Sequence, residues 1–329
     1  MSKANKILVT LPFAKEMITS FDTCVQRMET LGFEVILDPR GRALKEEELL
    51  EYAPQLVADI CSSDQWTEKT LNAAPNLEVI SRMGVGYDSI DVKAATQRGV
   101  GVTITVAANA PDVAEYAFSM IMAMTRKLFQ ADRLVRDGGE WKRVFSHSLY
   151  GKTLGVIGLG NIGKQLIKLV SGFNMRVLAY DTVLDETFAA QNGITYCNLD
   201  ELLKKSDIIS MHALLSDETR NMISDREFSL MKPEAMLVNC ARGGIVDEAA
   251  LYRALEKKQI LSAALDVFDE EPPSPDNPLL KLDNVILSPH TAGMTFEGRS
   301  RLVEIAFQNA LDVMEKKSPP GLINPQIFN

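Results

Sequence analysis

The sequence predicts an α/β protein made of two units, each with a parallel β-sheet wound on both faces by helices. Three observations predict this class. Short apolar runs alternate with helical stretches along most of the chain, as expected when helices connect parallel strands. One strand–turn–helix–strand segment carries three regularly spaced glycines. The length of 329 residues suggests about two domains, each able to bury its own core.

The first hundred residues already form one α/β unit in this prediction. Short runs rich in apolar and β-branched residues are expected to be buried strands. The intervening stretches have helical spacing of apolar residues. The expected strands are Lys6–Thr10, Glu34–Asp38, Val57–Cys61, Leu77–Arg82 and Val102–Thr105, and the clearest helices are Glu46–Tyr52 and Thr67–Ala74.

The stretch SRMGVGYDSID interrupts this alternation at residues 81–91. Two glycines flank Val85 at the carboxyl end of a predicted strand, which is the edge where open α/β sheets bind ligands. Free N–H groups in such a turn could hold a carboxylate. The alternative is a plain strand-to-helix turn, with Asp88 or Ser89 capping the next helix. The residues alone leave both interpretations open.

A long helix is expected over ANAPDVAEYAFSMIMAMTRKL, with Pro111 in its first turn. Asp112 and Glu115 suit the positive end of the helix dipole. The helix is apolar on most of its circumference, which predicts burial. We expect it to connect the two units and to contact a second subunit. The segment Asp137–Ser148 is expected to be a polar loop.

Bulk properties argue against several classes of partner. The net charge of −9 gives no support for a nucleic-acid partner, since phosphate binding needs a basic surface. No run of 18 or more apolar residues is present, so no membrane span is expected. The cysteines at positions 24, 61, 197 and 240 are scattered, without C-x-x-C pairs or histidines at metal-ligand spacing. We therefore expect reduced cysteines, no metal site and a cytoplasmic protein.

The segment Gly151–Asp181 predicts a dinucleotide site. Its glycines Gly158, Gly160 and Gly163 fit G-x-G-x-x-G between a predicted strand and a helix. The first permits a tight turn, the second lets a pyrophosphate approach the backbone, and the third lets the helix pack close to the strand. N–H groups at the start of the helix would attract the phosphate charge. The alternative is an ordinary βαβ unit without a ligand.

Asp181 closes this segment, 18 residues beyond Gly163. A carboxylate there can accept hydrogen bonds from a ribose diol and would repel a 2′-phosphate. No arginine follows it in DTVLDE. The sequence therefore favours NAD over NADP.

Strands and helices continue to alternate after this segment. Asn198 and Asp247 are residue types that commonly cap helix N-termini. The expected strands are Asp207–His212, Ala235–Cys240, Leu261–Val267 and Val285–Leu287, and the expected helices are Asn198–Lys205 and Asp247–Lys258.

Three loops that follow strands carry the candidate catalytic residues Arg242, Glu271 and His290. A guanidinium can bind a carboxylate bidentately and polarise a carbonyl. An imidazole is the usual general acid near neutral pH, and a neighbouring carboxylate orients it and stabilises its charged form. Two of these residues also have a structural interpretation: Arg242 could form an ion pair with Asp247, and DVFDEEP could be an acidic surface turn. Together the three predict hydride transfer to a 2-oxo acid, the nicotinamide supplying the hydride.

These motifs resemble the D-isomer-specific 2-hydroxyacid dehydrogenases, most closely the phosphoglycerate dehydrogenase-like branch. SRMGVGYDSID, GKTLGVIGLGNIG, NCARGGIVDE, ALDVFDEEP and SPHTAG occur in order from residue 81 to 293. The resemblance implies that Arg242, Glu271 and His290 are catalytic, and that the backbone around Val85 and Gly86 binds the substrate carboxylate. It further implies cofactor contacts at Gly158, Gly160, Asn161, Ile162, Gly163, Asp181, His212, Ala213, Cys240, Ala241, Asp266 and Gly293, with a structural rather than catalytic role for His212.

The resemblance also implies a domain insertion. Residues 106–293 would form a Rossmann NAD-binding domain, inserted into a flavodoxin-like substrate domain of residues 1–105 and 294–329. A helix from about Phe296 to Lys317 would return to the first domain. The active site would lie in the cleft, and family members are typically dimers through the cofactor domain.

Two departures bear on the substrate. Phosphoglycerate dehydrogenases often carry a basic residue after the third strand, where this chain has Cys61 followed by SSDQW. Arg82 could still face a phosphate. Formate-oxidising relatives have Gln where Glu271 stands, which counts against that activity.

The leading prediction is an NAD-dependent D-2-hydroxyacid dehydrogenase that acts on a small 2-hydroxy or 2-oxo acid, with 3-phosphoglycerate as one candidate, and that forms a homodimer. A glyoxylate or hydroxypyruvate reductase is the first alternative. An NAD-sensing binding protein of the transcriptional corepressor type is the second.

Overall fold

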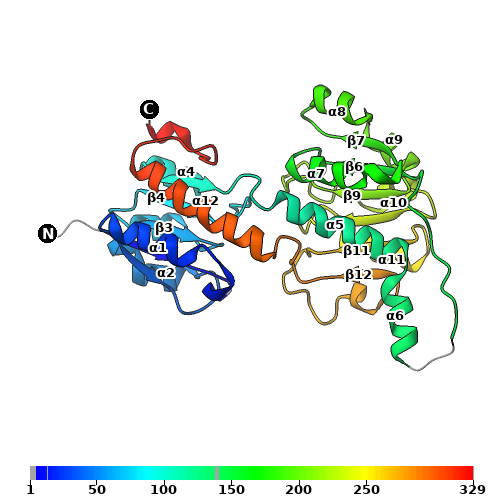
Figure 1. Ribbon diagram of the computed structural model, residues 1–329, viewed down its shortest axis with the longest axis horizontal. Coiled ribbons are helices and arrows are strands. Elements are labelled where there is room, and N and C mark those ends of the chain that lie inside the picture. Colours follow the sequence, from blue (N-terminus) through cyan, green and yellow to red (C-terminus); the bar gives the residue numbers. More distant parts are fainter. Residues whose placement is uncertain (1–4, 13, 138–140, 329) are drawn as a thin grey trace. The chain divides into compact units, whose positions relative to one another are not determined.

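The chain folds into two compact units in the computed structural model, which describes residues 5–12, 14–137 and 141–328 (Figure 1). The first unit comprises Met1–Asn109 and Met294–Asn329, and the second comprises Ala110–Gly293. The second unit is thus inserted into the sequence of the first. The assignment of one unit to the substrate and the other to the cofactor stays a prediction.

The first unit is built on a five-stranded sheet in which all neighbouring strands are parallel. Its strand order is β2-β1-β3-β4-β5, the flavodoxin-like order. The strands are β1 (Lys6–Val9), β2 (Glu34–Leu37), β3 (Leu56–Cys61), β4 (Val79–Arg82) and β5 (Gly101–Ile104).

Helices cover both faces of this sheet (Figure 1). One face buries apolar residues under α1 (Phe21–Thr30) and α12 (Phe296–Met314). The other packs against α2 (Glu46–Tyr52), α3 (Glu68–Asn72) and α4 (Val92–Gln97). The sheet is therefore doubly wound, as the alternating sequence predicts.

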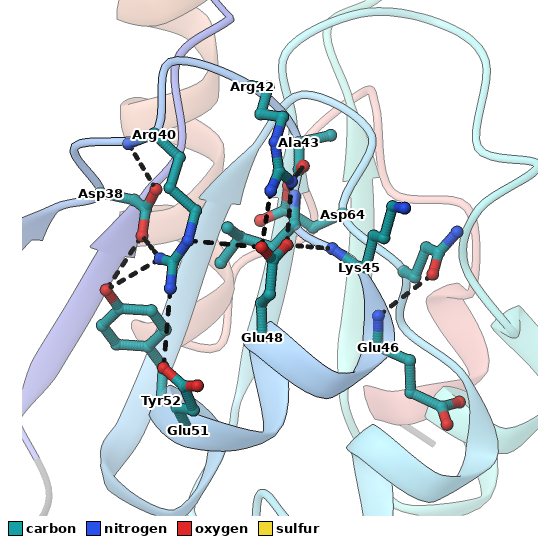
Figure 2. A network of polar contacts seen from close by, with 12 residues as sticks. Asp38, Arg40, Arg42, Ala43, Lys45, Glu46, Glu48, Glu51, Tyr52 and Asp64 are labelled. Carbon is teal, nitrogen blue, oxygen red and sulfur yellow. Dashed lines mark hydrogen bonds and ion pairs between the residues drawn. The ribbon is translucent and has the colours of Figure 1, made fainter.

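A polar network fastens the loop after β2 to α2 (Figure 2). Arg40 pairs with the buried Asp38, whose carboxylate also accepts a hydrogen bond from Tyr52 at 2.9 Å. Arg42 forms two hydrogen bonds with Glu48, at 2.6 and 2.8 Å, and this contact lowers the pKa of Glu48 to about 2. The loop after β2 is thereby held in one conformation beside the carboxyl end of the sheet.

The second unit is built on a seven-stranded sheet, also parallel throughout. The strand order is β12-β11-β10-β9-β6-β7-β8, so the direction of winding reverses between β9 and β6. This is the Rossmann order with one additional strand, and ligands bind at the carboxyl ends of the strands at such a reversal. The strands are β6 (Thr153–Ile157), β7 (Arg176–Tyr180), β8 (Ile194–Tyr196), β9 (Ile208–Met211), β10 (Met236–Asn239), β11 (Ser262–Leu265) and β12 (Val285–Leu287).

Two buried apolar clusters lie on opposite faces of this sheet. The first packs α5 (Ala110–Thr125), α7 (Asn161–Val170) and α8 (Glu186–Asn192) against the strands. The second packs α9 (Leu199–Lys205), α10 (Asp225–Leu230) and α11 (Glu248–Glu256). Short 3₁₀ turns complete the chain at Lys15–Met17, Ala53–Gln55, Ser171–Phe173, Pro278–Lys281 and Pro325–Phe328.

The long helix expected to reach Leu128 is present as α5 but ends three residues earlier. α5 ends at Thr125, and Lys127 has a φ of +51°, which a right-handed helix cannot accommodate. A second helix, α6 (Leu128–Arg136), follows. α5 packs into the core of its unit, whereas α6 has no buried residue. The polar-loop prediction holds for residues 141–148, and residues 138–140 lie outside the described residues.

The capping predictions are partly right. Asn198 and Asp247 cap α9 and α11 through their side chains. α4 is capped by Asp91, whose carboxylate accepts the N–H of Ala94 at 2.9 Å, and not by Asp88 or Ser89. The chain needs more residues than expected to turn out of β4, so the helix begins later. Among the described helices, none has the length and apolar character to cross a membrane.

Candidate active site

The glycines of the loop after β6 have three different surroundings. Gly158 has a φ of +93°, and a Cβ there would stand 2.6 Å from the peptide between His212 and Ala213. A Cβ on Gly163 would stand 2.5 Å from the carbonyl oxygen of Gly158. A Cβ on Gly160 would meet no atom within 4 Å. Two of the glycines are therefore required by packing, while Gly160 borders open space.

The start of α7 offers unused donors beside that space. The N–H groups of Asn161 and Ile162 make no hydrogen bond with any residue in the described ranges. Such groups, at the positive end of a ten-residue helix, bind phosphate. The loop and helix start therefore fit the pyrophosphate of a dinucleotide.

Asp181 lies directly beyond β7 and faces the glycine loop. Its Oδ2 accepts the N–H of Leu159 at 2.6 Å, and its Oδ1 accepts the N–H of Val183 at 2.9 Å. Each carboxylate oxygen keeps a further lone pair. The side chain is thus oriented by the loop and can still accept hydrogen bonds from a ribose diol.

His212 follows β9 and has a neutral ring. Its Nε2 lies 2.9 Å from Ser210 Oγ, and its Nδ1 is buried without a hydrogen-bond partner among the described residues. Burial lowers the pKa of His212 to about 4. The backbone of His212 and Ala213 packs against Gly158. An uncharged ring beside this contact suits a structural role for His212.

Glu271 and His290 meet directly. His290 Nδ1 lies 2.7 Å from Glu271 Oε2, and Glu271 Oε1 accepts the N–H of Phe268 at 3.1 Å. Burial acts to raise the pKa of Glu271, but the contact with His290, the Phe268 N–H and the charge of Arg242 outweigh it and lower that pKa. Glu271 is therefore ionised near neutral pH, and within the described residues His290 Nε2 makes no hydrogen bond, so it can face a substrate.

Arg242 lies in the turn after β10, close enough for its charge to act on Glu271. Its Nη1 donates to the carbonyl oxygen of Ala241 at 2.7 Å. Asp247 instead accepts the N–H of Ala250 and the hydroxyl of Ser224. No ion pair joins Arg242 to Asp247 in the part of the chain that the structure describes. The structural alternative for this arginine is therefore wrong.

Asp266 holds the His290 loop in place. Its backbone oxygen accepts the N–H of His290 at 2.8 Å. Its buried carboxylate accepts the N–H groups of Thr291 and Ala292, both at 2.8 Å, and the hydroxyl of Ser288 at 2.5 Å. His290 has a φ of +50°, a conformation that costs a non-glycine residue about 1 kcal/mol or more. These bonds offset that strain.

The remaining predicted cofactor contacts lie in the same unit. Ala241 donates its N–H to Asn239 Oδ1, and Gly293 ends the His290 loop. The Cys240 thiol is buried against Met120, and burial together with the charge of Asp266 raises its pKa. Cys240 is therefore a packing residue, and its buried side chain is not available to a ligand.

Sequence reasoning missed the role of Asn239. Its Nδ2 donates to the carbonyl oxygen of Arg242 at 2.9 Å, while its Oδ1 accepts the N–H of Ala241. The side chain thus closes the turn that presents Arg242. An asparagine at the end of a strand and just before a turn is the signal that would have found it.

The turn after β4 belongs to the first unit. Gly84 has a φ of +151°, and a Cβ there would collide with the Arg82 guanidinium. Arg82 donates to the carbonyl oxygen of Met83 at 3.0 Å and to Ser63 Oγ at 3.3 Å. Within the described residues, the N–H groups of Val85 and Gly86 make no hydrogen bond. Two unused donors beside a guanidinium suit an anion.

Comparisons with known proteins agree with these sites. The NAD binding domain of the D-isomer specific 2-hydroxyacid dehydrogenases matches residues 118–292, slightly more than half of the chain. A glyoxylate reductase of Korarchaeum cryptofilum is 41% identical over 271 residues, which cover 80% of this chain and 81% of that protein. A D-3-phosphoglycerate dehydrogenase of Archaeoglobus fulgidus is 42% identical over 296 residues, which cover 89% of this chain but 54% of that protein.

Among solved structures, a D-lactate dehydrogenase of Aquifex aeolicus, in complex with NAD and lactic acid, matches with a TM-score of 0.85. Its sequence is 27% identical, and the match covers 97% of this chain and 99% of that one. The chain belongs to the D-isomer specific 2-hydroxyacid dehydrogenase family, a family of NAD-dependent oxidoreductases.

Proposed function

We propose that this chain transfers a hydride between NAD(H) and a small D-2-hydroxy acid or its 2-oxo acid. The observation that carries this proposal is the pair formed by Glu271 and His290 beside the charge of Arg242. All three stand in the unit that contains the glycine loop. A bound nicotinamide supplies or accepts the hydride.

The chain's own residues would handle the proton and the substrate charge. His290, held through Nδ1, donates a proton from Nε2 to the carbonyl oxygen during reduction and takes it back during oxidation. Glu271 stabilises the charged imidazole. Arg242 binds the carboxylate of the substrate and polarises the adjacent carbonyl. In the first unit, the N–H groups of Val85 and Gly86, unused among the described residues, are a second candidate site for a carboxylate.

Two kinds of substrate are supported by the relatives' names. The name of the glyoxylate reductases supports glyoxylate, and hydroxypyruvate is the second small 2-oxo acid that we consider. The phosphoglycerate dehydrogenase favours a phosphorylated acid, and Arg82 with Ser63 is the pair in the first unit that could face its phosphate. Cys61 is buried and offers no second cation. We propose glyoxylate or hydroxypyruvate as the first candidate substrate and 3-phosphoglycerate as the second.

A panel assay tests the function. Purified protein receives NADH with glyoxylate, hydroxypyruvate, 3-phosphohydroxypyruvate or pyruvate, and NADH oxidation is followed at 340 nm, the usual wavelength for reduced nicotinamide. We expect turnover with at least one acid. His290→Ala should lower kcat by roughly 10²–10⁴, the usual contribution of general acid catalysis. No turnover by the wild-type protein with any of the four acids would refute the proposal.

We also propose a cytoplasmic homodimer. All four cysteines are free, which suits a reducing compartment. Helix α6 supports the dimer because Leu128, Phe129 and Val135 are 58%, 54% and 65% exposed. Apolar side chains grouped in this way are typical of subunit interfaces. Light scattering on the purified protein measures its mass, and a monomer at micromolar concentration would contradict this part.

A further inference from the structure

Behind the catalytic side chains, a chain of hydrogen bonds connects α11 to two of the catalytic loops. The N–H of Gly244 donates to Asp269 Oδ1 at 2.5 Å. The N–H of Asp269 donates to Glu248 Oε1 at 2.6 Å. Asn277 Nδ2 donates to Glu248 Oε2 at 2.7 Å. Glu248 is the first residue of α11, so a rigid element anchors the connection.

The two loops that are connected in this way touch through their backbones. A Cβ on Gly243 would stand 1.8 Å from the carbonyl oxygen of Phe268. One loop presents Arg242, the residue before Gly243. The other presents Glu271, which the N–H of Phe268 orients. A shift of one loop along the other therefore changes the separation of Arg242 and Glu271.

Asp269 and Glu248 are the side chains that resist such a shift. Gly244 is buried, so its N–H needs an acceptor, and Asp269 supplies one from the opposite loop. Glu248 uses both carboxylate oxygens to hold the segment from Asp269 to Asn277. Hydrogen bonds to a charged acceptor are about twice as strong as neutral ones.

We propose that Asp269 and Glu248 are positioning residues of this enzyme, which set the distance between Arg242 and the Glu271–His290 pair. The inference rests on the proposed function, because Arg242, Glu271 and His290 must carry the reaction for their spacing to affect it. A purely structural role would change stability alone. A positioning role changes turnover and its pH dependence in a protein that remains folded.

The test compares Asp269→Ala, Asp269→Asn and Glu248→Ala with a control on the same helix. The control is Glu256→Ala, because within the described residues the side chain of the exposed Glu256 accepts only the hydroxyl of Tyr252, at 2.7 Å. Asparagine keeps an acceptor oxygen for the N–H of Gly244, so Asp269→Asn should recover most of the loss. Measurements are kcat, KM and the pH profile with the best acid of the panel, and the Kd for NADH by fluorescence.

We expect Asp269→Ala and Glu248→Ala to lower kcat by roughly 10- to 100-fold, the effect of misplacing reacting groups by about 1 Å. Their Kd for NADH should change less than kcat, because the glycine loop is untouched. The alkaline limb of the reductive pH profile should move to lower pH, since a misplaced Glu271 carboxylate no longer contacts the ring. Wild-type kcat and pH profile in both alanine variants would overturn the inference.

A second readout separates this inference from the proposed function. Hydrogen exchange of the cofactor-free protein reports on the loops without any turnover. Exchange should rise in both residues 240–244 and residues 266–271 in Asp269→Ala, and should stay at the wild-type level in Glu256→Ala. If the wild type reduces no acid, the proposed function fails. Unchanged exchange in Asp269→Ala refutes the connection between the loops, whatever the activity.

Discussion

At the scale of single residues, the chemistry depends on how each charged group is held. Oε1 of Glu271 accepts a hydrogen bond from the backbone N–H of Phe268, and Oε2 lies within hydrogen-bond distance of His290 Nδ1. Its lowered pKa keeps the carboxylate charged across the neutral range. His290 is held from its ring and from its backbone, since its N–H donates to Asp266. A half-exposed imidazole thereby keeps one orientation.

Glu271→Gln tests the pairing of these two residues. Glutamine keeps a hydrogen bond to the ring but removes the charge that stabilises the imidazolium. Reduction needs the protonated ring, so the alkaline limb of its pH profile should move to lower pH. The pH dependence of kcat/KM for NADH-driven reduction measures this shift. A profile that coincides with that of the wild type would remove Glu271 from this role.

The same substitution has a stability consequence with a definite sign. A carboxyl group with a pKa lowered by folding stabilises the protein above its unfolded pKa, and this contribution disappears as the pH falls through the folded pKa. Glu271→Gln should therefore lower the thermal midpoint at neutral pH, and this effect should shrink below about pH 4, near the unfolded pKa of glutamate, and disappear below the lowered folded pKa. Differential scanning calorimetry at both pH values provides the comparison.

At the scale of elements, the cofactor prediction rests on β6, the glycine loop that follows it, and α7. The sequence predicted three roles for the glycines, and the surroundings of Gly158, Gly160 and Gly163 agree with them. What the sequence did not predict is the partner of Gly158, the peptide between His212 and Ala213. That contact joins residues from two neighbouring strands, and their adjacency exists only in the folded sheet.

Two glycine variants of this loop distinguish an effect on NADH binding from an effect on packing and stability. Gly160→Ala places a methyl group in open space, so the protein should fold normally but bind NADH at least about tenfold more weakly, a loss of about 1.4 kcal/mol. Gly163→Ala forces a Cβ against the Gly158 carbonyl and should cost roughly 1–3 kcal/mol of stability. Fluorescence titration and thermal unfolding measure the two effects. Equal NADH affinity in Gly160→Ala and the wild type would argue against a pyrophosphate at this loop.

Helix α6 is an element that the sequence pattern did not predict. Periodicity predicted a helix from Pro111 to about Leu128, but not its interruption and continuation. The break occurs at Lys127, whose backbone adopts a left-handed conformation. A lysine does not predict such a conformation. The strongly apolar α5 is buried by its own unit, whereas α6 is not. Only the folded arrangement of each unit decides which apolar helix finds a partner within it.

At the scale of the whole molecule, two parallel sheets with different strand orders account for both groups of sites. Each unit places its candidate ligand contacts at the carboxyl ends of its strands. The first unit also buries two carboxyl groups, one in its central strand β3 and one in the loop that follows it. Asp59 and Asp64 are both fully buried, and each has one oxygen without a hydrogen-bond partner among the described residues. Burial raises the pKa of Asp64 to about 7 and raises that of Asp59 as well.

This pair predicts how stability depends on pH. A carboxyl group with a pKa raised by folding favours the folded state at low pH, and stability is lost as the pH rises through the folded pKa, here from about 4 to about 7 for Asp64. Asp59→Asn removes one charge and keeps the acceptor for Trp66 Nε1. Its thermal midpoint should therefore rise relative to that of the wild type as the pH increases from 5 to 8.5.

Asp22→Asn is the matched control, because the Asp22 side chain is 91% exposed. Its thermal midpoint should follow that of the wild type across the same range. A difference between Asp59→Asn and wild type that does not grow with pH would show that folding does not raise the pKa of Asp59.

The sequence by itself determined the α/β class, most strands, the glycine loop and the residue types that can bind a carboxylate or move a proton. These are local properties, set by apolar periodicity, by conformational freedom and by side-chain chemistry. Arg242, Glu271 and His290 could be chosen because each follows a strand. Only the tertiary structure decided that Glu271 and His290 touch, that Asp247 does not pair with Arg242, and that Asp266 holds the His290 loop. Such contacts join residues distant in the chain, so they depend on strand order and loop packing, which local pattern does not encode.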